Sequence, residues 1–396
     1  MKNNKNNLQK NPLKNIYTDK NFLCDNILKD IEKYRLINQK KQIIDDLAEL
    51  CLGYIKNKAA SIKKQERLRV IDEKKPKKSL SNGLCKKDLQ NLPDWIKSNI
   101  KEAYLMGKSG RIASLKGKKY HLNNPLNDLS GGEWTYFLRS VINTRYPANG
   151  NDGFAHNIRK IHPSPKPPQL MRDIIKFFTK KDEWVLDYFM GVGGTLLGAS
   201  LCDRKAVGID LNPKYIEAYK KASEALGLKK QETMRGDALK LLESERLKTI
   251  IGKEKLSFIC IDPPYGDMMN RKKTGEAAKR KESTEATPFS NLSNDLGNVN
   301  FQSFLKLLKK SVEQALDLLK NKRYVVVFTK DFQPSGKNSN LLHADIINTL
   351  NEIEALRYVG MKIWADESIN LYPYGYPYAF VPNQLHQYIL IFRKEL

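Results

Sequence analysis

Cysteine and histidine are scarce in this chain, with five of each among 396 residues. No two cysteines form a Cys-x-x-Cys pair, and His156 and His162 lack the spacing of metal ligands, so neither a zinc site nor a disulfide framework is indicated. Unpaired thiols of this kind are typical of reducing compartments. We therefore expect a cytoplasmic protein whose site holds no metal.

Long hydrophobic runs are also missing. No stretch approaches the ~20 apolar residues of a membrane span, and the polar N-terminus lacks the apolar segment of a signal peptide. No complete Gly-x-x-x-x-Gly-Lys-Ser/Thr phosphate loop is present either, which disfavours a nucleoside triphosphate as ligand. The sequence therefore predicts a soluble, intracellular protein with no membrane partner.

Acidic residues are too few to balance the basic ones. The chain has 44 Asp and Glu against 69 Lys and Arg, a net charge of +25. Residues 1–150 alone hold 31 basic against 15 acidic residues. Such an excess attracts polyanions, and nucleic acid is the polyanion that basic proteins bind through its phosphates. A solvated, Lys-rich surface is the alternative explanation for charge alone.

The chain changes character near residue 150. Residues 1–20 have the composition of a disordered segment, and residues 25–73 carry apolar side chains at helical spacing. A second basic segment follows to about residue 145. We predict that residues 1–150 form a basic, mainly helical N-terminal region that takes part in target recognition.

From about Arg159 onward, short apolar runs alternate with helical patterns. This alternation predicts a doubly wound, mainly parallel α/β sheet over residues 151–396. The expected strands are Trp184–Asp187, Ala206–Asp210, Ser257–Ile261 and Tyr324–Phe328, with Met361–Trp364 and Gln387–Phe392 as a closing antiparallel pair. The expected helices are Gln169–Phe178, Pro213–Leu226, Ala238–Leu247 and Phe304–Asn321. A polar insertion at 266–300 interrupts the pattern, and a loop of this length is functional or disordered.

A glycine-rich turn at 187–195 follows a predicted strand and opens a helix. Glycines there let the backbone approach a ligand and turn its amides toward it. Asp210 and Asp237 stand at the ends of the next two strands, and the first of these positions reaches the ribose hydroxyls of an adenosine in doubly wound sheets. The alternative is that each acid only caps the helix that follows it.

The tetrapeptide Asp262-Pro263-Pro264-Tyr265 directly follows an apolar strand. Because prolines cannot continue a central strand, the chain forms a stiff elbow that projects Asp262 and Tyr265 at the strand's end. A carboxylate and a backbone carbonyl can accept both N–H groups of an aromatic amine, and a tyrosine ring can stack on the base that carries it. Cys260 precedes this elbow and is expected to be a small core residue.

These motifs resemble the amino-methyltransferases of DNA, which modify adenine-N6 or cytosine-N4. The resemblance covers residues 159–394 and includes the segment His162-Pro163-Ser164-Pro165-Lys166-Pro167. It implies a seven-stranded Rossmann-like methyltransferase sheet and S-adenosylmethionine as cofactor. It assigns cofactor binding to His162, Lys166, Pro167, Asp187, Phe189, Gly191, Gly193, Thr195, Asp210 and Asp237, and catalysis to Asp262, Pro263, Pro264 and Tyr265. The usual glycine-rich pattern of the family is Asp-Pro-Phe-x-Gly-Ser-Gly-Thr. Tyr188, Val192 and an inserted Gly194 depart from it.

The order of the motifs places target recognition outside the catalytic core. Only 23 residues separate Ala238 from Asp262, which leaves no room for a recognition domain between them. Recognition is therefore expected in the N-terminal region or in a DNA-facing insertion at 266–300. Arg271 and Lys272 of that insertion are candidate phosphate contacts, although a solvated loop is an equal alternative.

An aromatic run near the C-terminus carries Tyr376, Tyr378 and Phe380. A base is methylated only after it leaves the duplex, so these rings are candidates for stacking on the extruded base. Packing of the loop against the sheet is the alternative role.

Three functions remain open on the sequence. The first is a site-specific methyltransferase of double-stranded DNA, with adenine-N6 favoured by family habit and a restriction endonuclease as partner. The second is a tRNA guanine-N2 methyltransferase, against which the helical character of residues 1–150 argues. The third is an inactive DNA-binding module, which the intact Asp262 and Tyr265 disfavour.

Overall fold

The computed structural model describes residues 52, 56, 78–80, 84–107, 109–147, 150–266, 295–332 and 341–395. The chain divides into two compact units, Met1–Lys78 and Ser79–Leu396. The expected disorder of residues 1–20 and the residues Arg271 and Lys272 lie outside the described residues. Of the helices expected at 25–73, only residues 52 and 56 are described, and both are helical. The motifs of the candidate site all belong to the second unit.

A small antiparallel sheet occupies the first part of this unit. Its strands, in the order β1-β2-β3-β4, are β1 (Lys78–Ser79), β2 (Tyr104–Met106), β3 (Ile112–Leu115) and β4 (Lys118–His121), with the short helices α3 (Lys86–Gln90) and α4 (Asp94–Lys97) beside them. Lys116 and Gly117 both have positive φ angles and close the β3–β4 hairpin. Leu80, Ile96 and Tyr120 are fully buried in its core. The expectation of a mainly helical region is therefore wrong for this part, because strands of three or four residues are too short to give a periodic pattern.

The boundary expected at residue 150 also differs from the observed one. Helix α5 (Gly131–Phe137) begins with a capping box between Ser130 and Glu133 and leads into strand β5 (Val141–Thr144). This strand pairs in parallel with residues Ile363–Asp366 of the large sheet. The chain therefore enters the large sheet before residue 150, and β5 was missed because it is short and half polar.

The large sheet has eight strands in the order β5-β11-β12-β10-β9-β6-β7-β8. Its other strands are β6 (Trp184–Asp187), β7 (Lys205–Asp210), β8 (Glu232–Arg235), β9 (Leu256–Ile261), β10 (Leu319–Thr329), β11 (Leu356–Asp366) and β12 (His386–Lys394). Strands β8, β7, β6, β9 and β10 run parallel, and β12 is antiparallel to both β10 and β11. The mainly parallel, doubly wound architecture is confirmed, with β5 as an eighth strand beyond the seven expected.

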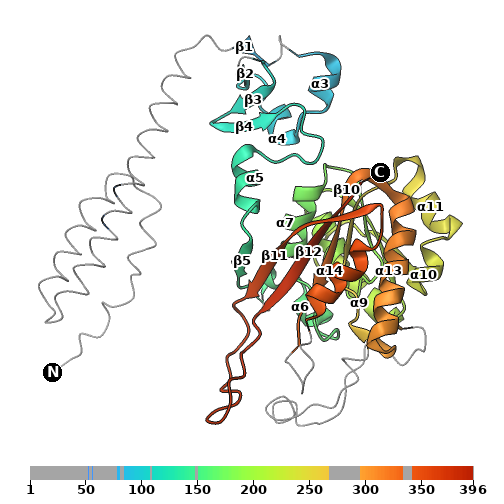
Figure 1. The fold of residues 1–396 in the computed structure, drawn as a ribbon. Coiled ribbons are helices and arrows are strands. Elements are labelled where there is room, and N and C mark those ends of the chain that lie inside the picture. Colours follow the sequence, from blue (N-terminus) through green and yellow to red (C-terminus); the bar gives the residue numbers. More distant parts are fainter. Residues whose placement is uncertain are drawn as a thin grey trace, which may run out of the picture. The chain divides into compact units, whose positions relative to one another are not determined.

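Helices cover both faces of this sheet (Figure 1). They are α6 (His156–Arg159), α7 (Pro168–Phe178), α8 (Gly194–Ser200), α9 (Pro213–Ala225), α10 (Ala238–Leu241), α11 (Glu245–Ile251), α13 (Phe301–Leu318) and α14 (Leu342–Asn351), with the 3-10 turns η2 (Asn151–Gly153), η3 (Gly252–Glu254) and η5 (Leu296–Asn298). One hydrophobic cluster joins α7, α8 and α9 to the sheet, and another joins α10, α11, α13 and α14 to it. The helix expected at 238–247 is split, because Ser244 caps a new helix by accepting from the Leu247 amide. No helix among the described residues has the length and apolar content to cross a membrane.

The carboxyl ends of the parallel strands meet at one edge of the sheet. Asp187, Asp210 and Asp262 stand at the ends of β6, β7 and β9, and Lys330 follows β10. In doubly wound sheets ligands bind at this edge. Cys260 is the next-to-last residue of β9 and has no exposed surface, which fits the core role expected for this thiol.

Candidate active site

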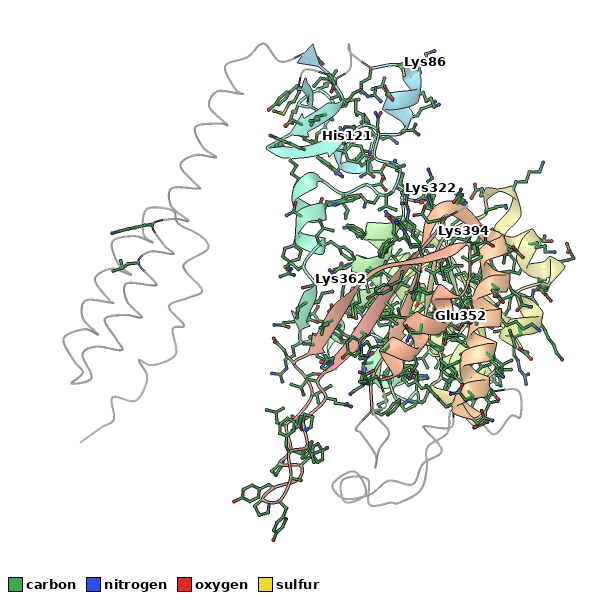
Figure 2. All side chains as sticks on the ribbon, in the orientation of Figure 1. Lys86, His121, Lys322, Glu352, Lys362 and Lys394 are labelled. Carbon is green, nitrogen blue, oxygen red and sulfur yellow. The ribbon has the colours of Figure 1, made fainter. Side chains whose placement is uncertain are left out.

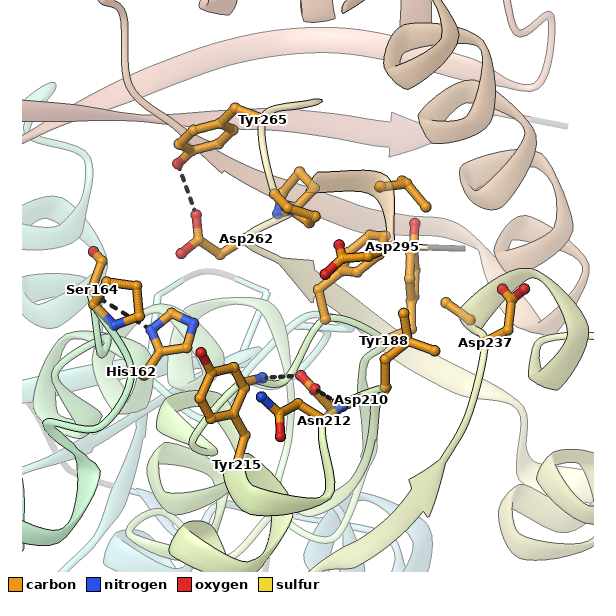
Figure 3. A pocket seen from close by; sticks show the side chains of 18 of the residues that line it. His162, Ser164, Tyr188, Asp210, Asn212, Tyr215, Asp237, Asp262, Tyr265 and Asp295 are labelled. Atoms are coloured by element: carbon orange, nitrogen blue, oxygen red, sulfur yellow. Dashed lines mark hydrogen bonds between the residues drawn. The ribbon is translucent and has the colours of Figure 1, made fainter. Parts of the chain in front are cut away.

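One cavity of about 250 Å³ lies at this edge, and Asp210, Asp237 and Asp262 all line it (Figure 3). Residues from five strand ends and from the loops beyond them form its walls. The polar and aromatic wall residues include His162, Ser164, Phe189, Asp210, Asn212, Tyr215, Asp237, Asp262, Tyr265, Lys330, Phe332 and Gln387, and Gly191, Pro263 and Pro264 lie between them. Since Asp210 and Asp262 share the cavity, a ligand held at β7 can reach the tetrapeptide at β9.

The β7 end of the cavity is built around the Asp210 carboxylate. Its Oδ2 accepts a hydrogen bond from the Gly191 amide at 2.8 Å, and its Oδ1 accepts from the Asn212 amide at 2.7 Å. Burial raises the pKa of Asp210 to about 6. Asp237 lines the same cavity and also caps α10 by accepting from the Leu239 amide at 3.0 Å. Capping and a place in the cavity are therefore compatible at Asp237.

Hydrogen bonds to the buried Asp187 carboxylate stabilise the glycine-rich turn. Asp187 accepts from the Phe189 amide at 3.1 Å and from the Thr195 hydroxyl at 2.5 Å, and burial raises its pKa to about 7. Gly193 has φ +74°, and a Cβ there would lie 2.2 Å from the Tyr219 ring. Asp187 and Thr195 border only a smaller neighbouring cavity, whereas Phe189 and Gly191 line the main one as well. Asp187, Thr195 and Gly193 therefore determine the conformation of the turn and do not form walls of the main cavity.

The Asp262 elbow follows a fully buried strand. Tyr265 donates its hydroxyl to Asp262 Oδ1 at 3.0 Å, and its ring meets Phe332 edge to face at 5.9 Å. Burial raises the pKa of Tyr265 well above its ordinary value, so the phenol keeps its proton as a donor. Pro263 and Pro264 line the cavity beside it.

Lys166 binds the same carboxylate from the other side. Its Nζ lies 2.5 Å from Asp262 Oδ2, and its side chain is only 8% exposed. The ammonium also lies 5.2 Å from the centre of the Phe328 ring. The sequence assigned Lys166 to the cofactor; the structure pairs it with the Asp262 carboxylate and places it in the smaller cavity beside the glycine-rich turn.

The other residues of the His162–Pro167 segment have separate positions. His162 lines the cavity and accepts from the Ser164 amide at 3.1 Å through Nδ1. Burial lowers its pKa to about 4, which keeps the ring neutral at physiological pH. Pro167 precedes α7 as its N-cap residue and lines neither cavity.

A buried arginine fixes the backbone of this segment. Arg159 is 1% exposed and donates to the carbonyl oxygens of Lys166 at 2.9 Å and Phe154 at 3.1 Å. Gly194, the residue inserted in the glycine-rich turn, has no side chain to block this approach, since a Cβ there would lie 2.7 Å from the Lys166 oxygen. The absence of a side chain at Gly194 therefore allows the Lys166 backbone to lie close to α8.

Several cavity residues were missed by reasoning from the sequence. Asn212, Tyr215 and Phe332 come within five residues of the end of β7 or β10. The rule that ligands bind beyond strand ends could have found them once the strands were predicted. Gln387 gave no such signal, because it lies inside the antiparallel strand β12.

The three aromatic candidates are not brought into the cavity. Tyr376, Tyr378 and Phe380 are 81%, 94% and 92% exposed in the connection between β11 and β12. The rings that do line the cavity beside Asp262 are Tyr265 and Phe332. The prediction that these three rings stack on a base held against Asp262 is therefore wrong.

Comparison with known proteins gives one family and several partial relatives. A family model described as DNA methylase, for N6 and N4 amino-methyltransferases, matches residues 1–221, more than half of the chain. The tRNA (guanine(10)-N2)-dimethyltransferase of Pyrococcus abyssi is 36% identical over 100 residues, which are 25% of this chain and 28% of that protein. The type II methyltransferase M1.MboII of Moraxella bovis is 31% identical over 102 residues, 26% of this chain and 36% of that one. The chain thus spans only about a third of the length of these relatives.

Among solved structures, TrmN from Thermus thermophilus is 16% identical with a TM-score of 0.35, and the match covers 57% of this chain and 48% of that one.

Proposed function

Because the chain belongs to the DNA methylase family and uses S-adenosylmethionine, we propose that it methylates an exocyclic amino group of a base in double-stranded DNA. Adenine-N6 is the favoured target and cytosine-N4 the second. The observation that carries the proposal is the shared cavity, in which Asp262 and Tyr265 face the same space as Asp210. A site-specific methylase of this kind works beside a restriction endonuclease, which we propose as the partner.

The residues of the cavity fit the cofactor. The Asp210 oxygens each retain an acceptor site beyond the backbone amides they already bind, which suits the two ribose hydroxyls. Leu211, Tyr215 and Leu296 supply apolar walls for the adenine ring. The bound cofactor supplies an electrophilic methyl group on a sulfonium.

The chain's own residues prepare the amine. Asp262 retains lone pairs on both oxygens, so it can accept one amino N–H while Tyr265 and Lys166 hold it in place. Accepting this hydrogen bond withdraws the nitrogen lone pair from the base ring and makes it a better nucleophile. Methyl transfer would form the new N–C bond as the sulfonium S–C bond breaks and a neutral thioether is released. The nitrogen would then carry a positive charge, and Asp262 would pass one of its protons to water. Preorganised electrostatics therefore supply most of the catalysis.

The test is methyl transfer from labelled cofactor to duplex DNA and to tRNA, followed by nucleoside analysis. We expect label in N6-methyladenine of DNA. Label in N4-methylcytosine would keep the enzyme class and change the base. Label confined to N2-methylguanine of tRNA would refute the proposal.

A tRNA guanine-N2 methyltransferase is the second candidate. The 36% identity to the Pyrococcus abyssi enzyme favours it. Residues 78–121 also no longer count against it, since they combine a four-stranded sheet with short helices instead of the helices expected there. The family match favours DNA, and the labelling experiment separates the two.

Cofactor affinity should depend on pH through Asp210. Its pKa is raised to about 6, so the carboxylate is ionised at pH 7 and largely protonated at pH 5. Protonation removes an acceptor for the ribose and the negative charge that attracts the sulfonium. We expect the Kd for S-adenosylmethionine to be about tenfold higher at pH 5 than at pH 7, by calorimetry. Asp210→Asn should bind weakly at both values. An unchanged pH dependence in that variant would assign the effect to Asp187.

Gly194→Ala should lower transfer through the Lys166 segment. The new Cβ would lie 2.7 Å from the Lys166 oxygen and 3.0 Å from its Cβ, so the segment must move. We expect a loss of about tenfold in kcat and about 1–3 kcal/mol in the free energy of unfolding. Gly132→Ala is the matched control, because a Cβ there meets nothing within 4 Å. Equal kcat in the two variants would contradict this role of Gly194.

A further inference from the structure

The connection between β11 and β12, residues 367–385, projects beyond the edge of the sheet that carries the cavity (Figure 1). Tyr376, Tyr378 and Phe380 expose between 81% and 94% of their surface, and Leu371 exposes 69%. Figure 2 shows the side chains of this loop standing clear of the sheet. Soluble proteins rarely expose contiguous apolar groups of this size unless the surface binds something. We call this segment the aromatic finger.

The finger is a folded element. Asn383 accepts from the Tyr372 amide at 2.9 Å and donates to the Tyr372 oxygen at 2.8 Å, which joins the two sides of the stem. Near the tip, the Gly375 oxygen accepts from the amides of Tyr378 and Ala379, both at 2.7 Å. The exposed rings are therefore presented by a closed turn.

The foot of the finger is tied to the cavity. Lys330 donates through Nζ to the Gln384 oxygen at 2.9 Å, and Lys330 itself lines the cavity. Gln387, three residues beyond Gln384, lines it as well. The foot of the finger is therefore joined to a wall of the cavity.

The composition of the finger identifies its occupant. Residues 368–385 contain no Lys, Arg, Asp or Glu, in a chain with a net charge of +25. An uncharged aromatic tip cannot grip phosphates, but it matches the flat faces of bases, on which aromatic rings stack without sequence preference.

We propose that the aromatic finger stacks on the bases that flank the target and lose a stacking neighbour when the target base leaves the duplex. The inference rests on the proposed function. A base must leave the stack before Asp262 can reach its amino group. Proteins that open duplexes insert apolar wedges at such steps. The rings of the finger thus stabilise the opened duplex while the target base occupies the cavity.

The test compares two sets of substitutions at exposed positions. Tyr378→Ala with Phe380→Ala removes both rings, whereas Tyr378→Trp with Phe380→Tyr keeps them. Tyr378→Leu with Phe380→Leu keeps apolar surface but removes flatness. We expect the alanine and leucine pairs to raise KM for a duplex oligonucleotide about tenfold and the aromatic pair to leave it near wild type. The Kd for S-adenosylmethionine should not change in any of them.

A second readout monitors the opening of the duplex. 2-Aminopurine at the target position fluoresces more strongly when it is unstacked, and this increase should be smaller with the alanine pair. Wild-type KM in the alanine or leucine pair would overturn the inference about the finger alone. A wild-type enzyme that transfers no methyl group to duplex DNA would instead overturn the proposed function. Binding to phosphatidylcholine–phosphatidylserine vesicles that the alanine pair abolishes would also overturn the inference, in favour of a lipid surface.

Discussion

Methyl transfer should fall by about 10³-fold or more when Asp262 is replaced by alanine, while the Kd for S-adenosylmethionine stays within about threefold of wild type. Asp262 contacts Tyr265 and Lys166 through hydrogen bonds, and neither belongs to the glycine-rich turn. Its loss removes the acceptor that draws the amino lone pair out of the base ring. It leaves in place Asp210, which supplies acceptors at the other end of the cavity.

Asp262→Asn serves as the graded control. The amide keeps one acceptor oxygen but loses the negative charge, and its NH₂ group cannot accept from Lys166 or Tyr265. We therefore expect activity between wild type and the alanine variant, measured by single-turnover transfer with calorimetry of cofactor binding alongside. Weak cofactor binding in Asp262→Ala would mean that the residue belongs to the cofactor end of the cavity.

The sequence predicted the position of Asp262 because its signals are local. An apolar strand that stops at two prolines can only turn, and parallel strands place their ends at one edge. The same logic located Asp210, Asp237 and the glycine-rich turn. Predicted strands such as Trp184–Asp187 agree with the structure because buried parallel strands are continuous apolar runs.

Partners far apart along the chain could not be predicted in this way. Lys166 and Asp262 are 96 residues apart, and the contact depends on how Arg159 and Gly194 fix the Lys166 backbone. The composition of a loop also does not show which of its aromatic side chains are buried. Tyr265 and Phe332 line the cavity, whereas Tyr376 is exposed to solvent, although all three are aromatic residues in connections that follow strands of the large sheet.

Lys166→Met should reduce kcat by about 10²-fold with little change in the Kd for S-adenosylmethionine. Lys166 is a positioning residue, since its ammonium touches the Asp262 carboxylate and balances its charge. Without it, Oδ2 of a half-buried carboxylate is left without its cation, and the carboxylate can turn away from the amine. Lys394→Met is the matched control. Lys394 is also buried, and it donates to the carbonyl oxygens of Leu316 and Leu319 away from the cavity. That variant should lose stability and keep kcat.

A double-mutant cycle separates positioning from mere packing. If Lys166 acts through the Asp262 charge, then Lys166→Met should cost much less in the Asp262→Asn background than in wild type, since the charge it balances is already gone. A purely structural lysine would cost the same factor in both backgrounds, and Lys394→Met supplies that additive case. Additive losses for Lys166 would therefore assign it to holding the His162–Pro167 segment in place. A strong interaction between the two substitutions would make the ion pair, and with it the approach of β9 to the Lys166 segment, part of the catalytic machinery.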